Sequence, residues 1–170
     1  AAVIAGSSIV TLNNRTLHAK RNFFGVLRVT SNPDDTMHAL FHGSTIHGRQ
    51  YTASERRCDP LSYFHREGPL GHVFGAFRVS TVPRNVAIVG LGAGATMAYA
   101  LPNESWTFYE INPAVVDVAR DSRYFTYVGN CAQVPFNVVL GDARLRLREA
   151  TDVGYGLIVL DAFSSDAIPI

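Results

Sequence analysis

Three glycines in a short turn have the spacing of a loop that binds a nucleotide-like ligand. Gly90, Gly92 and Gly94 directly follow the apolar residues 86–89, which have the character of a buried parallel strand. Glycine lets the backbone approach a ligand closely, and the helical stretch expected at 95–101 would present free amides to a polar or anionic group. The same spacing fits the alanine-ended form of a dinucleotide fingerprint, so a dehydrogenase stays open as an alternative.

Carboxylates end the next three apolar stretches of the chain. Glu110 follows Gly94 at a distance along the chain where a ribose diol would be held. Asp142 and Asp161 follow the two apolar stretches after it. Ligands of open α/β sheets bind at the carboxyl ends of the strands, so we expect these three carboxylates and the glycine turn to converge on one crevice. Taken alone, Asp161 would also suit the cap of a helix.

Alternating strands and helices must position these groups, and the pattern predicts an α/β fold with a parallel sheet. The expected strands are 86–89, 106–110, 136–140 and 156–160. The expected helices are 69–79, 95–101 and 113–120, with Asn112 as the N-cap of the last and Pro113 as its first residue. Arginines alternate with leucines after Asp142, which predicts a short helix with a solvated basic side. Between Tyr124 and Pro135 we expect a loop that has room for a short helix.

The first part of the chain carries β signals instead. Residues 8–12 and 15–19 predict a hairpin, and 23–30 and 37–41 predict further strands, while no helical period is visible. A sheet of this size needs the next domain or a second copy to complete its core. Residues 60–67 predict a loop or a short turn of helix. We therefore divide the chain into an N-terminal β region, 1–67, and a nucleotide-binding domain, 68–170.

Two histidines and two cysteines invite a metal interpretation. His42 and His47 are five residues apart without a carboxylate or cysteine at ligand spacing, so we expect a glycine-bearing turn at 42–51 and no metal site. Cys58 and Cys131 also lack ligand spacing. We expect them to be thiols in a reducing compartment, with a disulfide as the open alternative.

Composition bounds the classes of function. The chain has 170 residues, of which 47% are hydrophobic and 17% charged, so it can bury a core. A net charge of +1 without a basic cluster argues against a nucleic-acid partner. No apolar run reaches the ~18 residues of a membrane span. Both faces of a parallel sheet need cover, and nothing follows the turn after 156–160, so we expect this chain to be a fragment of a longer protein.

The sequence resembles the spermidine synthase family of polyamine aminopropyltransferases, in particular bacterial spermidine synthase-like domains fused to membrane segments. The resemblance is carried by FFGVLRV at 23–29, HGSTIHGRQ at 42–50, VGLGAG at 89–94, FYEINP at 108–113, GDA at 141–143 and LDAFSSDAIP at 160–169. It implies a methyltransferase-like Rossmann fold, one that binds S-adenosylmethionine-type ligands, preceded by a small antiparallel β domain. The last motif is the most specific of the six.

The resemblance also implies roles for individual residues. The donor, decarboxylated S-adenosylmethionine or S-adenosylmethionine, would contact Gln50, Gly90, Gly92, Gly94, Glu110, Asp142 and Ala143. Within this set Glu110 would accept the ribose hydroxyls, and Asp142 with Ala143 would face the adenine. Asp161 and Asp166 would hold the acceptor amine, and Tyr63 would lie beside it. A carboxylate such as Asp161 suits this task because it binds an ammonium group and can accept its proton.

Two departures from the family pattern keep alternatives open. Ala93 stands where the family has an aspartate that contacts the aminopropyl ammonium, and the family's Tyr-His-Glu stretch is poorly matched by Tyr63-Phe64-His65. The leading hypothesis is aminopropyl transfer to a polyamine. The alternatives are a methyltransferase and a non-catalytic module that binds an adenosine-type ligand. The resemblance implies a homodimer formed through the β region and a cytoplasmic domain, tethered to a membrane by segments outside this chain.

Overall fold

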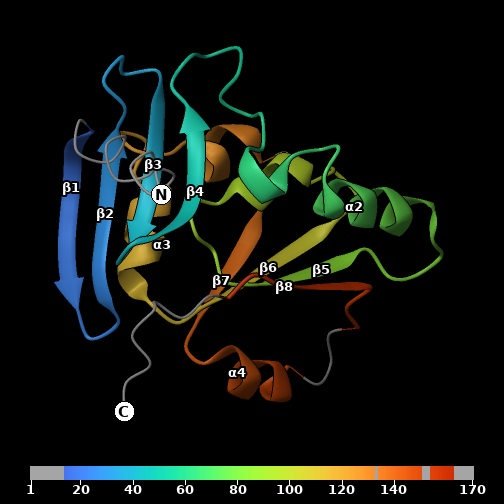
Figure 1. Ribbon diagram of the computed structural model, residues 1–170. Helices are drawn as coiled ribbons and strands as arrows, with labels where there is room; N and C mark the ends of the chain where they lie inside the picture. Colours follow the sequence, from blue (N-terminus) through green and yellow to red (C-terminus); the bar gives the residue numbers. More distant parts are fainter. Residues whose placement is uncertain (1–13, 133, 151–153, 163–170) are drawn as a thin grey trace, which may run out of the picture.

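The computed structural model describes residues 14–132, 134–150 and 154–162, which form two four-stranded sheets (Figure 1). The first sheet is an antiparallel meander in which each strand pairs with the next along the chain. Its strands are β1 (Arg15–Asn22), β2 (Gly25–Ser31), β3 (Met37–His42) and β4 (Thr45–Tyr51). The expected β region is confirmed here, while the expected strand 8–12 lies outside the described residues.

The second sheet is parallel, in the order β7-β6-β5-β8. Its strands are β5 (Asn85–Val89), β6 (Ser105–Glu110), β7 (Phe136–Leu140) and β8 (Leu157–Leu160), close to the predicted ranges. The helices between and before them are α2 (Pro69–Val79), α3 (Pro113–Arg120) and α4 (Ala143–Glu149). Chain order and parallel pairing give the predicted α/β fold, with the carboxyl ends of β5, β6 and β7 at one edge.

Side-chain caps fix where two of the helices begin. The Asn112 side chain accepts a hydrogen bond from the Ala114 amide at 3.0 Å, and Pro113 occupies the first helical position of α3. Asp142 caps α4 by accepting from the Leu145 amide at 3.1 Å. Both caps directly follow strands, so they place helix starts at the edge of the sheet where ligands bind.

One apolar core joins the two sheets. Leu27 and Leu40 of the antiparallel sheet belong to the same buried cluster as Ile88 and Phe108 of the parallel sheet. On α2, the Phe74 ring stacks on Trp106 with 5.4 Å between centroids. The small antiparallel sheet therefore completes its core against the Rossmann-type unit. The division between residues 67 and 68 falls between a short helix, η1 (Ser62–Phe64), and α2, and it stays a prediction.

Two local predictions differ from the structure, and a third agrees with it. The expected turn at 42–51 contains the strand β4. The sequence pattern did not reveal this strand, because its inward-facing positions are Gly48 and Gln50 and so show no alternation of apolar and polar residues. The stretch after the glycine turn is a 3₁₀ helix, η2 (Ala95–Tyr99), in place of the expected helix 95–101. The loop with room for a short helix expected between Tyr124 and Pro135 contains a π-helical turn, η3 (Tyr127–Cys131), as predicted.

The expectation of two thiols is wrong, because Cys58 and Cys131 form a disulfide. Their separation of 73 residues gave no signal, but the loop after β4 folds against η3 and brings the two Cα atoms to 5.4 Å. Disulfides are typical of oxidising surroundings. The cytoplasmic location stays a prediction without support from this bond.

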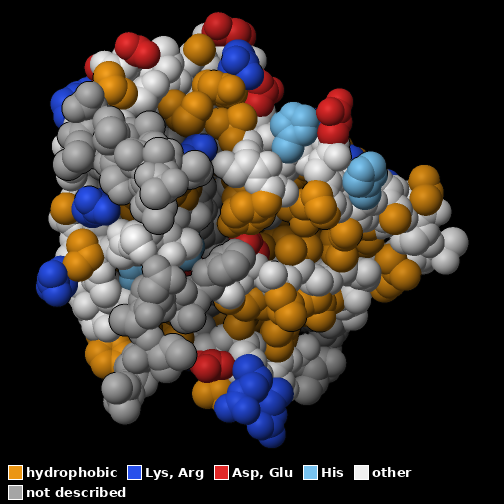
Figure 2. Space-filling model, viewed as in Figure 1, with side chains coloured by type: hydrophobic (Ala, Val, Ile, Leu, Met, Phe, Trp, Pro, Cys, Tyr) orange, Lys and Arg blue, Asp and Glu red, His pale blue; other side chains and the backbone are white. Residues whose placement is uncertain are grey.

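The surface divides by side-chain type (Figure 2). Arg side chains gather over α4, and hydrophobic side chains gather between α2 and α4, over the parallel sheet. Ile158 and Leu160 of the edge strand β8 are 47% and 78% exposed. The basic outer side of α4 agrees with the predicted solvated arginines. Within the described residues, no helix combines the length and the apolar character that crossing a bilayer requires.

Candidate functional site

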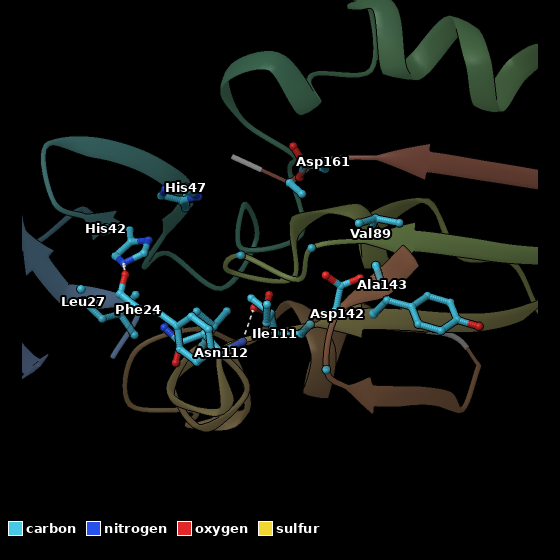
Figure 3. Close-up of a pocket in the computed structure, with 18 of the residues that line it drawn as sticks. Phe24, Leu27, His42, His47, Val89, Ile111, Asn112, Asp142, Ala143 and Asp161 are labelled. Atoms are coloured by element: carbon cyan, nitrogen blue, oxygen red, sulfur yellow. Dashed lines mark hydrogen bonds between the residues drawn. The ribbon is translucent and has the colours of Figure 1, made fainter. Parts of the chain in front are cut away.

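A cavity of about 670 Å³ lies between the antiparallel sheet and the carboxyl ends of β5, β6 and β7. Figure 3 shows Phe24, Leu27 and His42 on one side of it and Asp142 and Ala143 on the other. Seven predicted site residues line it: Tyr63, Gly90, Gly92, Glu110, Asp142, Ala143 and Asp161. The structure therefore brings together most of the residues that the sequence assigned to one crevice.

The glycine turn is crossed closely by two other segments of the chain. Gly90 has φ +95°, and a Cβ atom there would lie 2.5 Å from the Asp161 carbonyl oxygen. Gly92 has φ +53°, and its Cβ would lie 2.6 Å from the His47 carbonyl oxygen. A side chain at either position would be strained and would collide with backbone. These glycines let the end of β8 and the middle of β4 each approach the turn closely.

Glu110 is buried and holds the glycine turn in place. Its Oε2 accepts a hydrogen bond from the Leu91 amide at 2.9 Å, and its Oε1 accepts one from the Asn112 amide at 2.8 Å. A carboxylate has about four acceptor positions, so each oxygen keeps one for a ligand hydroxyl. The predicted contact with ribose is thus compatible with this geometry and stays a prediction.

The far end of the cavity is formed by the turn between β7 and α4. Asp142 and Ala143 lie there with Ile111, whose side chain is 49% exposed. Half-exposed apolar groups beside one carboxylate suit a flat heteroaromatic ring with an amino group. This is the place that the resemblance assigned to adenine.

Asp161 and Tyr63 form a hydrogen-bonded pair at the opposite wall. Burial raises the pKa of the Asp161 carboxyl to about 6, and the hydrogen bond from Tyr63 opposes part of this shift. Burial and the neighbouring carboxylate raise the pKa of the Tyr63 hydroxyl, so the tyrosine is the donor of the pair. A carboxylate with a pKa near 6 is ionised at neutral pH and can take a proton from a bound group.

Two predicted residues lie outside the cavity wall. Gln50 is 3% exposed, and its amide oxygen accepts from the Thr126 amide at 2.8 Å while its nitrogen donates to the Arg57 carbonyl at 2.7 Å. It joins β4 to the segment that leads into η3. Gly94, with φ +82°, packs against Val128. Asp166 lies outside the described residues, and the donor contacts expected of Gln50 and Gly94 stay predictions.

The sequence analysis did not assign His42, His47 or the hairpin turn at 23–25 to the ligand site, although all of them line the cavity. His42 and His47 line the cavity with 5.7 Å between their ring centroids, and His42 Nε2 bonds the carbonyl of Phe24. The HGSTIHG segment carried a signal, but it was interpreted as a turn, so the strand β4 that carries His47 was not predicted. Within the described residues, no group of three or more His, Cys, Asp or Glu side chains is placed to hold a metal ion.

Solved spermidine synthases have the same two-part architecture. A spermidine synthase in complex with the transition state analogue AdoDATO superposes with a TM-score of 0.63, at 13% identity, over 90% of this chain and 48% of its own. The fold is that of spermidine synthase. The enzyme from Thermotoga maritima gives a TM-score of 0.63 at 16% identity over 88% of this chain and 49% of its own. The present chain thus spans about half the length of these structures.

Other comparisons add no relative. No protein-family model matches the sequence, and neither does any curated protein. The likeness to the spermidine synthases therefore concerns the fold, and the activity must be argued from the cavity.

Proposed function

We propose that this chain carries the donor pocket of an aminopropyltransferase-like enzyme. The reaction moves an aminopropyl group from decarboxylated S-adenosylmethionine to an amine and leaves methylthioadenosine. The observation that carries the proposal is the pair Asp161 and Tyr63 in the wall of a cavity whose floor is the glycine turn. A cavity of about 670 Å³ lies within the usual range for sites that bind small molecules, about 300 to 1,000 Å³.

The chemistry needs little from the protein beyond alignment and a base. The carbon bound to a sulfonium is already activated, so an amine held behind it can attack, forming a C–N bond while the C–S bond breaks. The amine arrives protonated and must lose a proton to free its lone pair. Asp161 accepts that proton, because its carboxylate is ionised above pH about 6 and is fixed by Tyr63.

The acceptor belongs to the polyamine class in this proposal. A polyamine carries several ammonium groups, and Asp161 would hold the reacting one while Asp166 holds a second. A homodimer formed through the β region also remains part of the proposal.

A methyltransferase is the second candidate, and one observation favours it. Ala93 is 1% exposed and packs against β4, so the glycine turn presents no carboxylate for an aminopropyl ammonium. Ordinary S-adenosylmethionine would then be the donor, and a methyl group would move by the same displacement at carbon.

The test is release of methylthioadenosine. The full-length protein is mixed with decarboxylated S-adenosylmethionine and putrescine, and the product is followed by chromatography. We expect methylthioadenosine to form with the wild type and not with Asp161→Asn. Transfer of a methyl group from ordinary S-adenosylmethionine would instead support the second candidate, and absence of both products would refute catalysis by this site.

A further inference from the structure

The middle of β4 packs directly on the glycine turn. A Cβ atom on Gly48 would lie 2.5 Å from the Cβ of Ala93, and the His47 carbonyl lies against Gly92. The side chain of Ala93 therefore points at the backbone of β4, where a larger side chain finds no room. This contact explains why the turn has no carboxylate at position 93.

The other carboxylates among the described residues of the wall are already engaged. Glu110 accepts two backbone amides of the turn, and Asp142 caps α4. Asp161 is paired with Tyr63 and serves the acceptor in the proposed reaction. A cationic tail that extends from the sulfonium along the glycine turn must therefore be recognised by a different kind of group.

His47 lies where that group is needed. Its backbone crosses Gly92, and the residue lines the same cavity as Gly92 and Asp161 (Figure 3). The His42 ring lies beside it with 5.7 Å between ring centroids and is fixed by the bond from Nε2 to the carbonyl of Phe24. Burial, and to a smaller extent the nearby His42, lower the pKa of His47, so its imidazole is neutral at pH 7 and carries one acceptor nitrogen.

We propose that His47 is the specificity-determining residue for the donor's tail. Its imidazole accepts a hydrogen bond from the ammonium at the end of the aminopropyl group, the task that a carboxylate of the glycine turn would otherwise perform. This inference rests on the proposed function and names the group that recognises the donor there. A neutral acceptor gives a charge-assisted hydrogen bond without a full ion pair, so the preference for the tail is moderate, about 10-fold to 100-fold in affinity.

The test compares two sulfonium ligands that differ in the tail alone. Decarboxylated S-adenosylmethionine has the aminopropyl group, and 5′-dimethylsulfonio-5′-deoxyadenosine has a methyl group in its place. Calorimetry of the full-length protein gives the ratio of the two affinities. We expect the wild type to prefer the tailed ligand by at least about 10-fold, the His47→Leu variant to show a ratio near one, and the His47→Asp variant to exceed the wild type.

Controls separate recognition from folding and from catalysis. His72 is exposed on α2, so His72→Leu should leave the ratio unchanged. If His47→Leu does not fold, His47→Gln and His47→Asp are compared, and the aspartate must give the larger ratio. The proposal is overturned by a wild-type ratio near one, by an unchanged ratio in His47→Leu, or by equal ratios in the Gln and Asp variants. Release of methylthioadenosine is scored separately, so the proposed function can fail while tail recognition stands, or the reverse.

Discussion

Replacing Asp161 by Asn should remove activity and at the same time make the protein more stable at neutral pH. Burial raises the pKa of this carboxyl from 3.8 to about 6, which means that the folded protein favours the neutral, protonated form. Above pH about 6 the carboxylate is nevertheless ionised, and the folded state bears the cost of a buried charge. An asparagine has a similar shape, stays neutral and can still accept the hydrogen bond from Tyr63.

The size of the effect follows from proton linkage. A rise of about two pKa units at about 1.4 kcal/mol each corresponds to about 3 kcal/mol. Because the pKa is raised on folding, the stability of the wild type falls as pH rises from about 4 to about 6 and stays lower above that range. The Asn variant lacks this loss. It should therefore be about 3 kcal/mol more stable at pH about 8 and equal to the wild type at pH about 4.

The assay is urea unfolding of both proteins at several pH values, followed by circular dichroism. Asp117 provides the matched control, because its side chain is 69% exposed and paired with Lys20, so Asp117→Asn should change the free energy of unfolding by less than about 0.5 kcal/mol. In parallel, turnover by the wild type should rise with pH through about 6 and then level, because the base must be ionised. A pH-independent difference between Asp161→Asn and the wild type, or a less stable variant at pH about 8, would refute the reasoning.

Other perturbations test the frame around the cavity. Gly92→Ala should lower the free energy of unfolding by about 1 to 3 kcal/mol, because φ is +53° and the new Cβ would lie 2.6 Å from a backbone oxygen. Thermal melts test this, and Gly129→Ala is the control, because a Cβ at that position meets no atom within 4 Å. Gln50→Leu should cost about 2 to 3 kcal/mol in urea unfolding, since it leaves buried backbone groups unpaired, and an unchanged stability would mean that the side chain serves a ligand alone. Replacing Cys58 and Cys131 by Ala should cost about 4 kcal/mol, checked by unfolding the wild type with and without reductant, and equal midpoints in the two conditions would contradict it.

The parallel sheet could be predicted because each of its strands is an apolar run that ends in a glycine or a carboxylate. Val86–Val89 and Phe136–Leu140 are readable from local pattern alone, and so are the caps Asn112 and Asp142 that follow strands. Chain order then places the strand ends at one edge, so the place of the cavity and seven of its lining residues followed from the sequence.

The parts that sequence analysis missed depend on contacts between distant segments. The buried residues of β4 are a glycine and a glutamine, which do not predict a buried strand by themselves. Their burial depends on the glycine turn that packs against this strand. Gln50 has the type of a ligand-binding residue, but its partners, 7 and 76 positions away, use its amide for packing. The disulfide likewise depends on where a loop folds, and no spacing rule foresees that.

The position of the disulfide determines how the molecule would respond to a pulling force. Cys58 and Cys131 enclose the two central strands, β5 and β6, while β7 and β8 lie beyond the loop on the C-terminal side. A force applied between the ends of the chain would pull β7 and β8 away from the sheet. It would not extend β5 and β6, because the disulfide closes a covalent loop around them between two cysteines that are 73 positions apart. Reduction would release about 260 Å of additional contour length, at about 3.6 Å per residue. The nucleotide-type turn thus lies in the part of the chain that bears no load until the bond is broken.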